Sequence, residues 1–161
     1  MTDDEKRLVR QLDSDLGKAW FRRTGRKAWH RTTDDCTLAV ALTKSPYGMQ
    51  YYVDLGAVIR PLEDIRTPKV KDLHISIRLS QLVAGDGAYT TIDARGTDLE
   101  DSTTPLPRKL RELSDAIVQH GLPFLDAIAT VDRMRATVQE GRFPAAAVWG
   151  TARTFLQNKN P

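Results

Sequence analysis

The fold is decided by the run from Trp20 to Leu82, which opens with Trp20-Phe21-Arg22-Arg23-Thr24-Gly25-Arg26-Lys27-Ala28-Trp29-His30-Arg31. Within this segment Thr24-Gly25-Arg26 is typical of a hairpin turn, and we expect short strands around Phe21 and Trp29 on either side of it. The run therefore begins an antiparallel meander.

Three strand-like stretches follow, and in each of them the larger apolar residues occupy alternate positions. These stretches are Cys36–Leu42, Tyr51–Ile59 and Leu73–Leu79. A hydrophobic period of two indicates strands that bury one face. We expect a further short strand at Tyr89–Ile92, in an otherwise loop-like stretch from Val83 to Thr104.

Helical patterns flank the strands. Leucines recur every four residues in Asp4–Ala19, and a second apolar stripe follows Pro105 and predicts a helix that stops at His120-Gly121, with Pro123 beyond. Asp132–Glu140 and Pro144–Asn158 predict two more helices. The whole chain, residues 1–161, is thus expected to be a single α+β domain: an antiparallel β-meander sheet with an N-terminal helix and C-terminal helices packed on it.

The same patterns predict the core. Alternation places one set of strand residues on the buried face of the sheet, and the helical stripe should cover it. The predicted set is Leu38, Val40, Val53, Leu55, Ile75 and Ile77, beneath Leu110, Leu113 and Ile117.

Composition limits the class of protein. Of the 161 residues, 40% are hydrophobic and 28% charged, which is typical of globular chains, and the formal net charge of +3 is too small to demand a nucleic-acid partner. Cys36 is the single cysteine, so no internal disulfide forms, and Met1-Thr2-Asp3-Asp4-Glu5 lacks the features of a secretory signal. No apolar stretch reaches the length of a membrane span. We expect a cytoplasmic protein that does not engage a membrane.

The order of elements resembles a known family. The leading helix, the Phe21–Trp29 hairpin, Tyr51-Tyr52-Val53-Asp54-Leu55-Gly56, His74-Ile75-Ser76-Ile77-Arg78-Leu79 and Gly121-Leu122-Pro123-Phe124-Leu125 are similar to the bacterial family called domain of unknown function 4304, over roughly residues 5 to 157. The resemblance implies a single α+β domain with an antiparallel sheet. It brings no established catalytic residues.

Motifs for common chemistries are missing from the sequence. There is no Cys-x-x-Cys, His-Glu-x-x-His or Gly-x-Ser-x-Gly, and no phosphate-cradling glycine loop. We therefore predict no metal site, no cofactor and no catalytic residues. Cys36 opens an apolar strand, which favours a small buried side chain over a nucleophile. An enzyme that uses Asp54, His74 and Arg78 remains a distant alternative.

Two groups of residues are candidates for binding. The first is a polar sheet face made of Tyr52, Asp54, His74, Ser76 and Arg78, which alternation places on one side of two strands. Such a face is either the solvated side of the sheet or a binding surface. The second is the basic hairpin with Arg22, Arg23, Arg26, Lys27, His30 and Arg31, whose cations either contact phosphates or simply cover apolar surface with their stems.

The expected function is a non-catalytic protein-binding module, with another protein as its partner. A small cytoplasmic domain of this kind suits a toxin-neutralising immunity protein, although that inference rests on analogy. The alternative is a nucleic-acid-associated module that uses the basic hairpin at residues 20–31. Salt-sensitive binding that Arg22, Arg23 and Arg26 jointly support would favour the alternative.

Overall fold

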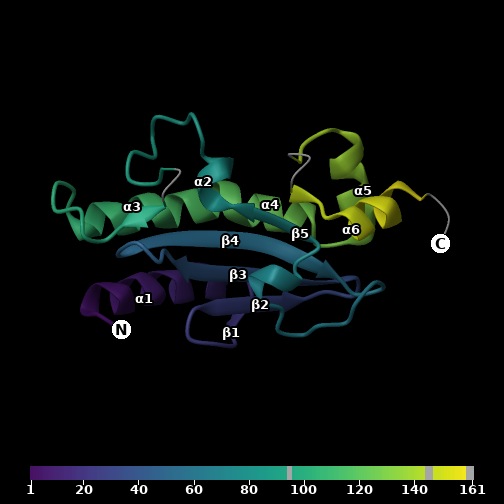
Figure 1. The fold of residues 1–161 in the computed structure, drawn as a ribbon, viewed down its shortest axis with the longest axis horizontal. Coiled ribbons are helices and arrows are strands. Elements are labelled where there is room, and N and C mark those ends of the chain that lie inside the picture. Colours follow the sequence, from purple (N-terminus) through teal and green to yellow (C-terminus); the bar gives the residue numbers. More distant parts are fainter. Residues whose placement is uncertain (94–95, 144–146, 159–161) are drawn as a thin grey trace.

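The computed structural model describes residues 1–93, 96–143 and 147–158. In this part of the chain, six strands form an antiparallel sheet in the order β1-β2-β3-β4-β5, with β6 paired to β4. The strands are β1 (Arg22–Arg23), β2 (Ala28–Thr32), β3 (Cys36–Lys44), β4 (Gln50–Ile59), β5 (Ile75–Arg78) and β6 (Thr97–Asp98). The predicted α+β class and the antiparallel meander are confirmed (Figure 1).

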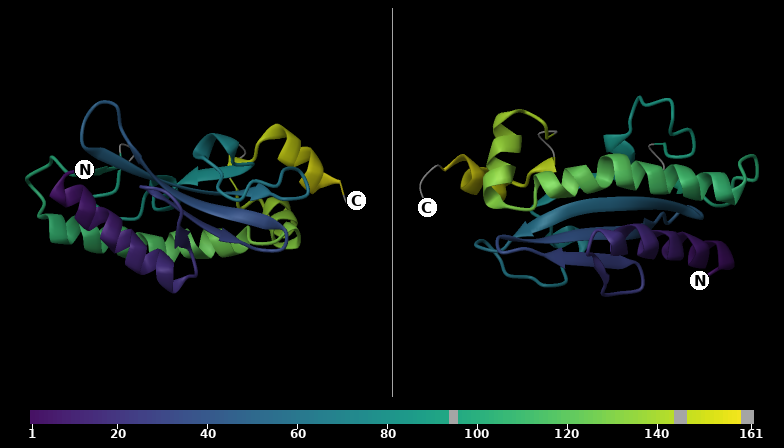
Figure 2. Two further views of the ribbon diagram at one scale, coloured as in Figure 1. Left: turned by 90° about the horizontal axis from the view of Figure 1, so that it is seen from below. Right: turned by 180° about the vertical axis from the view of Figure 1, so that it is seen from behind.

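Most helices precede or follow the strands, as the sequence predicts, whereas α2 (Leu79–Leu82) lies between β5 and β6 and was not predicted. The others are α1 (Asp3–Lys18), α3 (Leu106–Ala116), α4 (Leu122–Ala127), α5 (Val131–Gln139) and α6 (Gly150–Gln157), with a 3₁₀ turn at Val70–Asp72 and a π-helical segment at Ile117–Gly121. Figure 2 shows α1 and the long helix of α3 and α4 on the same side of the sheet. No helix in the described ranges combines the length and the apolar character that a membrane crossing requires.

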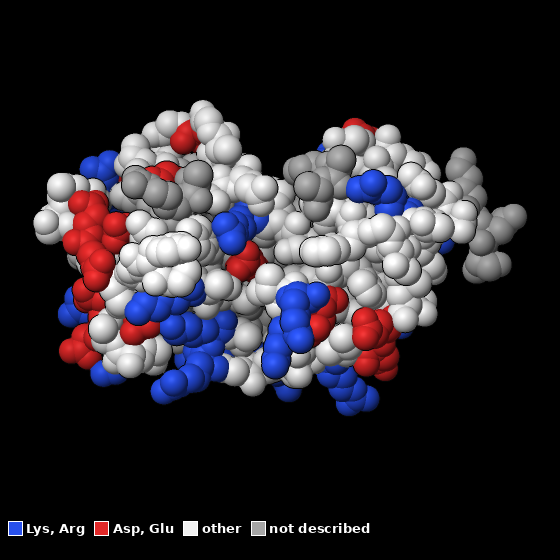
Figure 3. Space-filling model, in the orientation of Figure 1, with Lys and Arg blue, Asp and Glu red and all other residues white. Residues whose placement is uncertain are grey.

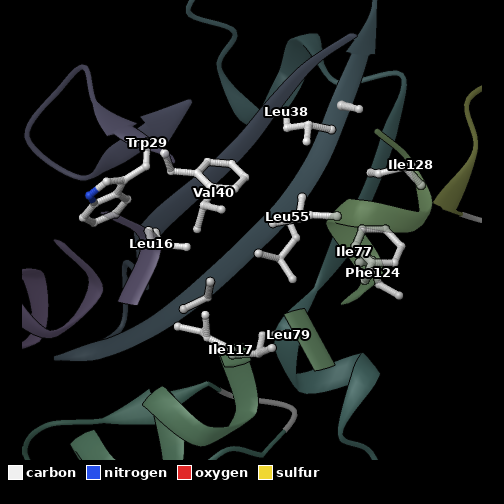
Figure 4. Close-up of a cluster of buried hydrophobic side chains, with 14 of the residues drawn as sticks. Leu16, Trp29, Leu38, Val40, Leu55, Ile77, Leu79, Ile117, Phe124 and Ile128 are labelled. Carbon is white, nitrogen blue, oxygen red and sulfur yellow. The ribbon is translucent and has the colours of Figure 1, made fainter. Parts of the chain in front are cut away.

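A row of side chains across four strands forms the centre of the core. Trp29, Val40, Leu55 and Ile77 are register partners on β2, β3, β4 and β5, and all four are buried. Figure 4 shows this row facing Leu16 of α1 and Ile117 of the π segment. The predicted core is confirmed, since Leu38, Val40, Val53, Leu55, Ile75, Ile77, Leu113 and Ile117 are all buried and Leu110 is partly buried against them.

The α1 helix ends in a strained corner. Trp20 has a φ of 67° and occupies the left-handed position just after the helix, where the amide of Phe21 donates back to the carbonyl of Leu16. Glycine is the usual residue at this position because a Cβ is unfavourable there. The Trp20 side chain is 82% exposed, so burial does not offset that strain.

Trp20→Gly should therefore stabilise the protein by about 0.5–1 kcal/mol, because relief of the left-handed strain exceeds the backbone entropy that glycine adds to the unfolded chain. Thermal unfolding would measure the effect. Trp20→Ala is the matched control, since it removes the ring but keeps the Cβ. A midpoint for Trp20→Gly no higher than that of Trp20→Ala would contradict the interpretation.

The third long strand is shorter than its alternating pattern predicts. Only Ile75–Arg78 forms β5, because Leu73 follows the 3₁₀ turn and packs on the opposite face of the sheet with Ala39 and Val58. Leu73 lies over Gly56, where a Cβ would approach its Cδ1 to 2.9 Å and the carbonyl oxygen of Ile75 to 2.1 Å. Leu79 leaves the strand as well and begins α2.

The strand predicted at Tyr89–Ile92 is wrong. Side chains on α3, and not a neighbouring strand, supply the partners of this segment: Tyr89 donates its hydroxyl to Asp115, and Thr91 donates both its amide and its hydroxyl to Glu112. The strand in this region is β6, at Thr97–Asp98, which pairs with the beginning of β4.

The predicted helix stop at His120-Gly121 is also wrong. The chain continues from α3 through the π segment into α4, and the amide of Leu122 donates to the carbonyl of Ile117, five residues earlier. The wider π turn accommodates Pro123, which has no amide proton and would crowd the carbonyl four residues before it in an α-helix. Gly121 serves packing here, because its position faces Leu55 and Leu79.

The last predicted helix begins later than expected. The helix α6 starts at Gly150 and not at Pro144, and residues 144–146 lie outside the described part of the chain. Val148 bridges to Ile75, and the amide of Trp149 donates to the carbonyl of His74 at 3.0 Å. The segment before α6 is therefore drawn into contact with the edge of β5.

Candidate functional site

Only part of the second face of the sheet is covered. The segment between β4 and β5 crosses one end of it, where Ile65 packs against Ala39 and Val58, and His30 makes a hydrogen bond to the carbonyl of Pro68. Beyond this segment Thr43, Tyr52, Asp54 and Arg78 form a polar surface, which we call the Arg78 patch. Figure 3 views the molecule in the orientation of Figure 1 and shows a hollow between two raised lobes above the sheet.

The Arg78 guanidinium is held between a carboxylate and a ring. Arg78 and Asp54 are register partners on β5 and β4, and Nε of Arg78 lies 3.4 Å from Oδ1 of Asp54. The guanidinium carbon lies 4.1 Å from the centroid of the Tyr52 ring, a cation–π contact. The Thr43 hydroxyl donates to the other oxygen of Asp54 at 2.7 Å. The buried carboxylate is thus paired, while the Arg78 side chain remains 47% exposed.

An open cleft of about 820 Å³ runs beside the Arg78 patch. Asp54, Ser76 and Arg78 of the sheet line it, together with Ser80 and Gln81 of α2 and residues of the segment from Val83 to Asp93, which we call the far wall. Clefts of this size are typical of ligand and peptide sites.

The far wall of the cleft is fastened to the long helix. Besides the hydrogen bonds of Tyr89 and Thr91, the Tyr89 ring meets His120 edge-on, with centroids 5.3 Å apart. Burial, followed by the hydrogen bond to Asp115, raises the pKa of Tyr89 to about 12. The wall is therefore a built part of the fold and not a loose loop.

Comparison with known families gives a match over most of the chain. The family model described as Domain of unknown function (DUF4304) matches residues 12–127, from α1 to the end of α4. The chain belongs to the DUF4304 family. No curated protein and no solved structure shows significant similarity to it. The DUF4304 match spans the whole sheet, the Arg78 patch and both walls of the cleft, whereas α5 and α6 lie beyond it.

The predicted polar face of this DUF4304 protein is brought together in part. Tyr52, Asp54 and Arg78 meet directly, and Ser76 shares the cleft with the last two. His74 lies elsewhere: it lines a separate hollow with Trp149 and Glu63. Its Nδ1 accepts the amide proton of Ile59 at 3.0 Å, so the neutral ring carries its proton on Nε2, which faces Glu63 at 3.7 Å. Burial lowers the pKa of His74, against an opposing effect of Glu63.

This separation bears on the enzyme alternative. A catalytic role for Asp54, His74 and Arg78 requires the three side chains to converge, and they line two different cavities. Across the described residues, no cluster of three His, Cys, Asp or Glu side chains has the arrangement of a metal site. Burial raises the pKa of the Cys36 thiol to about 12, so the thiol stays protonated.

Most cations of the basic hairpin have acidic partners within the fold. Arg23 pairs with Asp13 at 3.1 Å, Lys27 with Glu5 at 2.9 Å and Arg31 with Asp126 at 2.8 Å. His30 is buried between Thr24 and Pro68, and burial lowers its pKa. These four residues bind the hairpin to α1, to α4 and to the segment between β4 and β5. Among the described contacts of the hairpin, Arg22 and Arg26 have no ionic partner.

Sequence reasoning missed three residues of the site. Thr43 pairs across the sheet with Tyr52 and supports Asp54, while Ser80 and Gln81 line the cleft from α2. Gln81 stands three residues after Arg78, the spacing of a helix capping pair, and its side-chain oxygen accepts the Arg78 amide proton. Arginine is not a typical N-cap residue, so the sequence gives no clear signal for a helix that begins after Arg78.

Proposed function

We propose that this protein is a non-catalytic protein-binding module of the bacterial cytoplasm, and that it binds its partner through the Arg78 patch and the adjoining cleft. The observation that carries the proposal is the arrangement of Arg78: an exposed guanidinium, stacked on Tyr52, beside an open cleft. Arginine and tyrosine are enriched among the residues that dominate binding energy at protein interfaces. A preorganised side chain also loses little entropy on binding.

The surroundings of Asp54 support a binding role over a catalytic one. The carboxylate is buried and accepts from Thr43 while Arg78 supplies the countercharge. A general base needs a free lone pair that faces the substrate. Here one oxygen accepts the Thr43 hydroxyl and the other faces Nε of Arg78.

A toxin-neutralising immunity role is the specific form of this proposal. An immunity protein acts by tight binding alone, so a rigid domain with one preorganised surface is sufficient. The cleft wall fixed to α3 and the Arg78 guanidinium fixed by Tyr52 both provide such rigidity.

Capture of one defined protein that depends on Arg78 tests the proposal. The full chain, Arg78→Gln and Arg22→Ala would each be used as bait, with bound proteins quantified by mass spectrometry. We expect the wild type and Arg22→Ala to recover the same partner, and Arg78→Gln to recover about tenfold less or lower still. Glutamine leaves a donor for Asp54 but removes the countercharge of that buried carboxylate, so thermal unfolding must show that Arg78→Gln is folded at the temperature of the capture.

Further outcomes of that experiment separate the hypotheses. If the partner is a toxin, its expression should arrest growth, co-expression of the wild type should restore it, and Arg78→Gln should fail to do so. Equal recovery by wild type and Arg78→Gln would contradict the proposal.

The nucleic-acid alternative has one observation in its favour. Trp20 is highly exposed near Arg22, and Arg22 and Arg26 lack ionic partners in the described structure, so a stacking ring and two cations are available. Co-purified nucleic acid that is released by salt and lost in Arg22→Ala would favour this second function.

A further inference from the structure

We propose that the cleft beside β5 receives a carboxylate side chain, from an aspartate or glutamate of the partner protein that stands next to an aliphatic residue. The inference rests on the proposed function for the source of the ligand and goes beyond it in naming the chemistry that the cleft recognises.

Arg78 is the centre of this site because its terminal nitrogens have no hydrogen-bond acceptor among the described residues. Its Nε faces Asp54 and its backbone amide donates to Gln81, but neither terminal nitrogen donates a hydrogen bond to a described residue. The contact with Asp54, at 3.4 Å, is longer than a normal hydrogen bond. A planar guanidinium that is already oriented by a ring offers two parallel donors, which is the geometry that a carboxylate accepts.

Three more donors line the same cleft without acceptors. The hydroxyls of Ser76 and Ser80 donate to no described residue, and the same holds for the side-chain NH₂ group of Gln81. The Gln81 oxygen is held by the Arg78 amide at 2.9 Å, which fixes the plane of that side chain. Together with the Arg78 guanidinium, these two hydroxyls and this amide are donors that a ligand with acceptor oxygens can satisfy.

The charges of the cleft select among anions. Among the described lining residues, Asp54 and Asp86 stand beside the Arg78 guanidinium. A dianion such as phosphate brings a second negative charge that the single positive charge of Arg78 does not offset beside these carboxylates. A single carboxylate is matched by the charge of Arg78.

The rest of the lining suits an aliphatic residue next to the acidic residue of the ligand. Ala84 is exposed in the cleft wall, and Val83 and Ile92 contribute apolar edges close to it. The volume of about 820 Å³ accommodates two adjacent side chains. A ligand that combines a carboxylate with an aliphatic group therefore uses both halves of the cleft.

Titration of the isotope-labelled full chain with small probes tests this inference. The probes are N-acetyl-Leu-Glu-amide, the neutral match N-acetyl-Leu-Gln-amide, and inorganic phosphate. The readouts are the backbone amide resonances of β5 and α2 and, in proteins that retain Arg78, its Nε–H resonance. We expect saturable shifts with the Glu peptide and an affinity at least about tenfold higher than that of the Gln peptide. Arg78→Gln should abolish the difference between the two peptides.

A second variant should raise the affinity for the Glu peptide instead of lowering it. Asp54→Asn keeps the hydrogen bond from Thr43 and the Tyr52 stack, and it removes the carboxylate that competes for Arg78. Binding of the Glu peptide should tighten, by roughly threefold. Equal affinity for the two peptides, phosphate binding as tight as that of the Glu peptide, or no tightening in Asp54→Asn would overturn the inference.

These outcomes are distinct from failure of the proposed function. Partner capture that depends on Arg78, together with no preference for the Glu peptide, refutes the carboxylate ligand and leaves the binding module intact. A clear preference for the Glu peptide with no Arg78-dependent partner supports the site and refutes the protein-binding function.

Discussion

Leu55→Ala should lower the free energy of unfolding by about 3–5 kcal/mol, the largest effect that we expect from a single truncation. Leu55 is fully buried at the centre of the row from Trp29 to Ile77. Its Cδ1 lies beside Gly121, 3.4 Å from where a Cβ would be. Glycine has no side chain that could move into the cavity left by the truncation. Packing across the π segment would be lost with the leucine.

Chemical denaturation would measure this loss. Val118→Ala is the matched control, because Val118 is an exposed aliphatic residue of the same π segment and should cost less than about 0.5 kcal/mol. Ile77→Ala, at the end of the row, should cost about 2–5 kcal/mol. If Leu55→Ala and Val118→Ala unfold at the same denaturant concentration, the assigned register is wrong.

Glu5→Gln should cost about 2 kcal/mol at pH 7, because it weakens a buried network that binds α1 to the sheet. Glu5 is buried, with 7% of the residue exposed. Its carboxylate accepts hydrogen bonds from the Tyr51 hydroxyl and from Lys27 Nζ. The amide of Thr2 donates to its second oxygen at 2.7 Å. Glutamine keeps the size of the side chain but has one acceptor atom and no charge, so Lys27 loses its counterion.

The pH dependence of stability gives this prediction a second measurement. The Tyr51 hydrogen bond, followed by that of Lys27, lowers the pKa of Glu5 from 4.5 to about 2. A depressed folded-state pKa means that the stabilisation is complete above the unfolded pKa and is lost as the pH falls toward the folded one. The difference in unfolding free energy between wild type and Glu5→Gln should therefore shrink between about pH 5 and pH 2. An equal difference at pH 7 and pH 2.5 would show that the charge of Glu5 is not responsible.

Alternation predicts the sheet well where both neighbours of a strand are strands. The pattern in β3 and β4 identifies Val40 and Leu55 as core residues, because a strand that is paired on both sides cannot change its parity. The pattern is misleading at Leu73, since β5 is an edge strand preceded by a tight turn that rotates this side chain to the other face.

Long-range partners account for the other differences from the sequence prediction. Tyr89 to Ile92 has the composition of a strand, but Asp115 and Glu112, more than twenty residues away, take its hydrogen bonds. His120-Gly121 has the composition of a helix stop, yet the chain continues as a π-helical segment in which Gly121 faces Leu55 and Leu79. Local composition carries no information about either partner.

The candidate site was also predictable only in part from the sequence. Parity places Tyr52 and Asp54 on one face, and Arg78 with Ser76 on one face, but only the register of β4 and β5 brings the two pairs together. The partners that neutralise the basic hairpin, such as Asp13 and Asp126, are remote in sequence. A linear reading therefore overstates the free positive charge of that hairpin.

Hydrogen–deuterium exchange of the protein, alone and saturated with its captured partner, tests the central proposal most directly. The account predicts slower exchange in peptides that cover β5 and α2, residues 75–82, and in the strand that carries Tyr52 and Asp54. Exchange in the basic hairpin at residues 20–31 should be unchanged. Protection of residues 20–31 with no change at residues 75–82 would contradict the proposal that the Arg78 patch binds the partner.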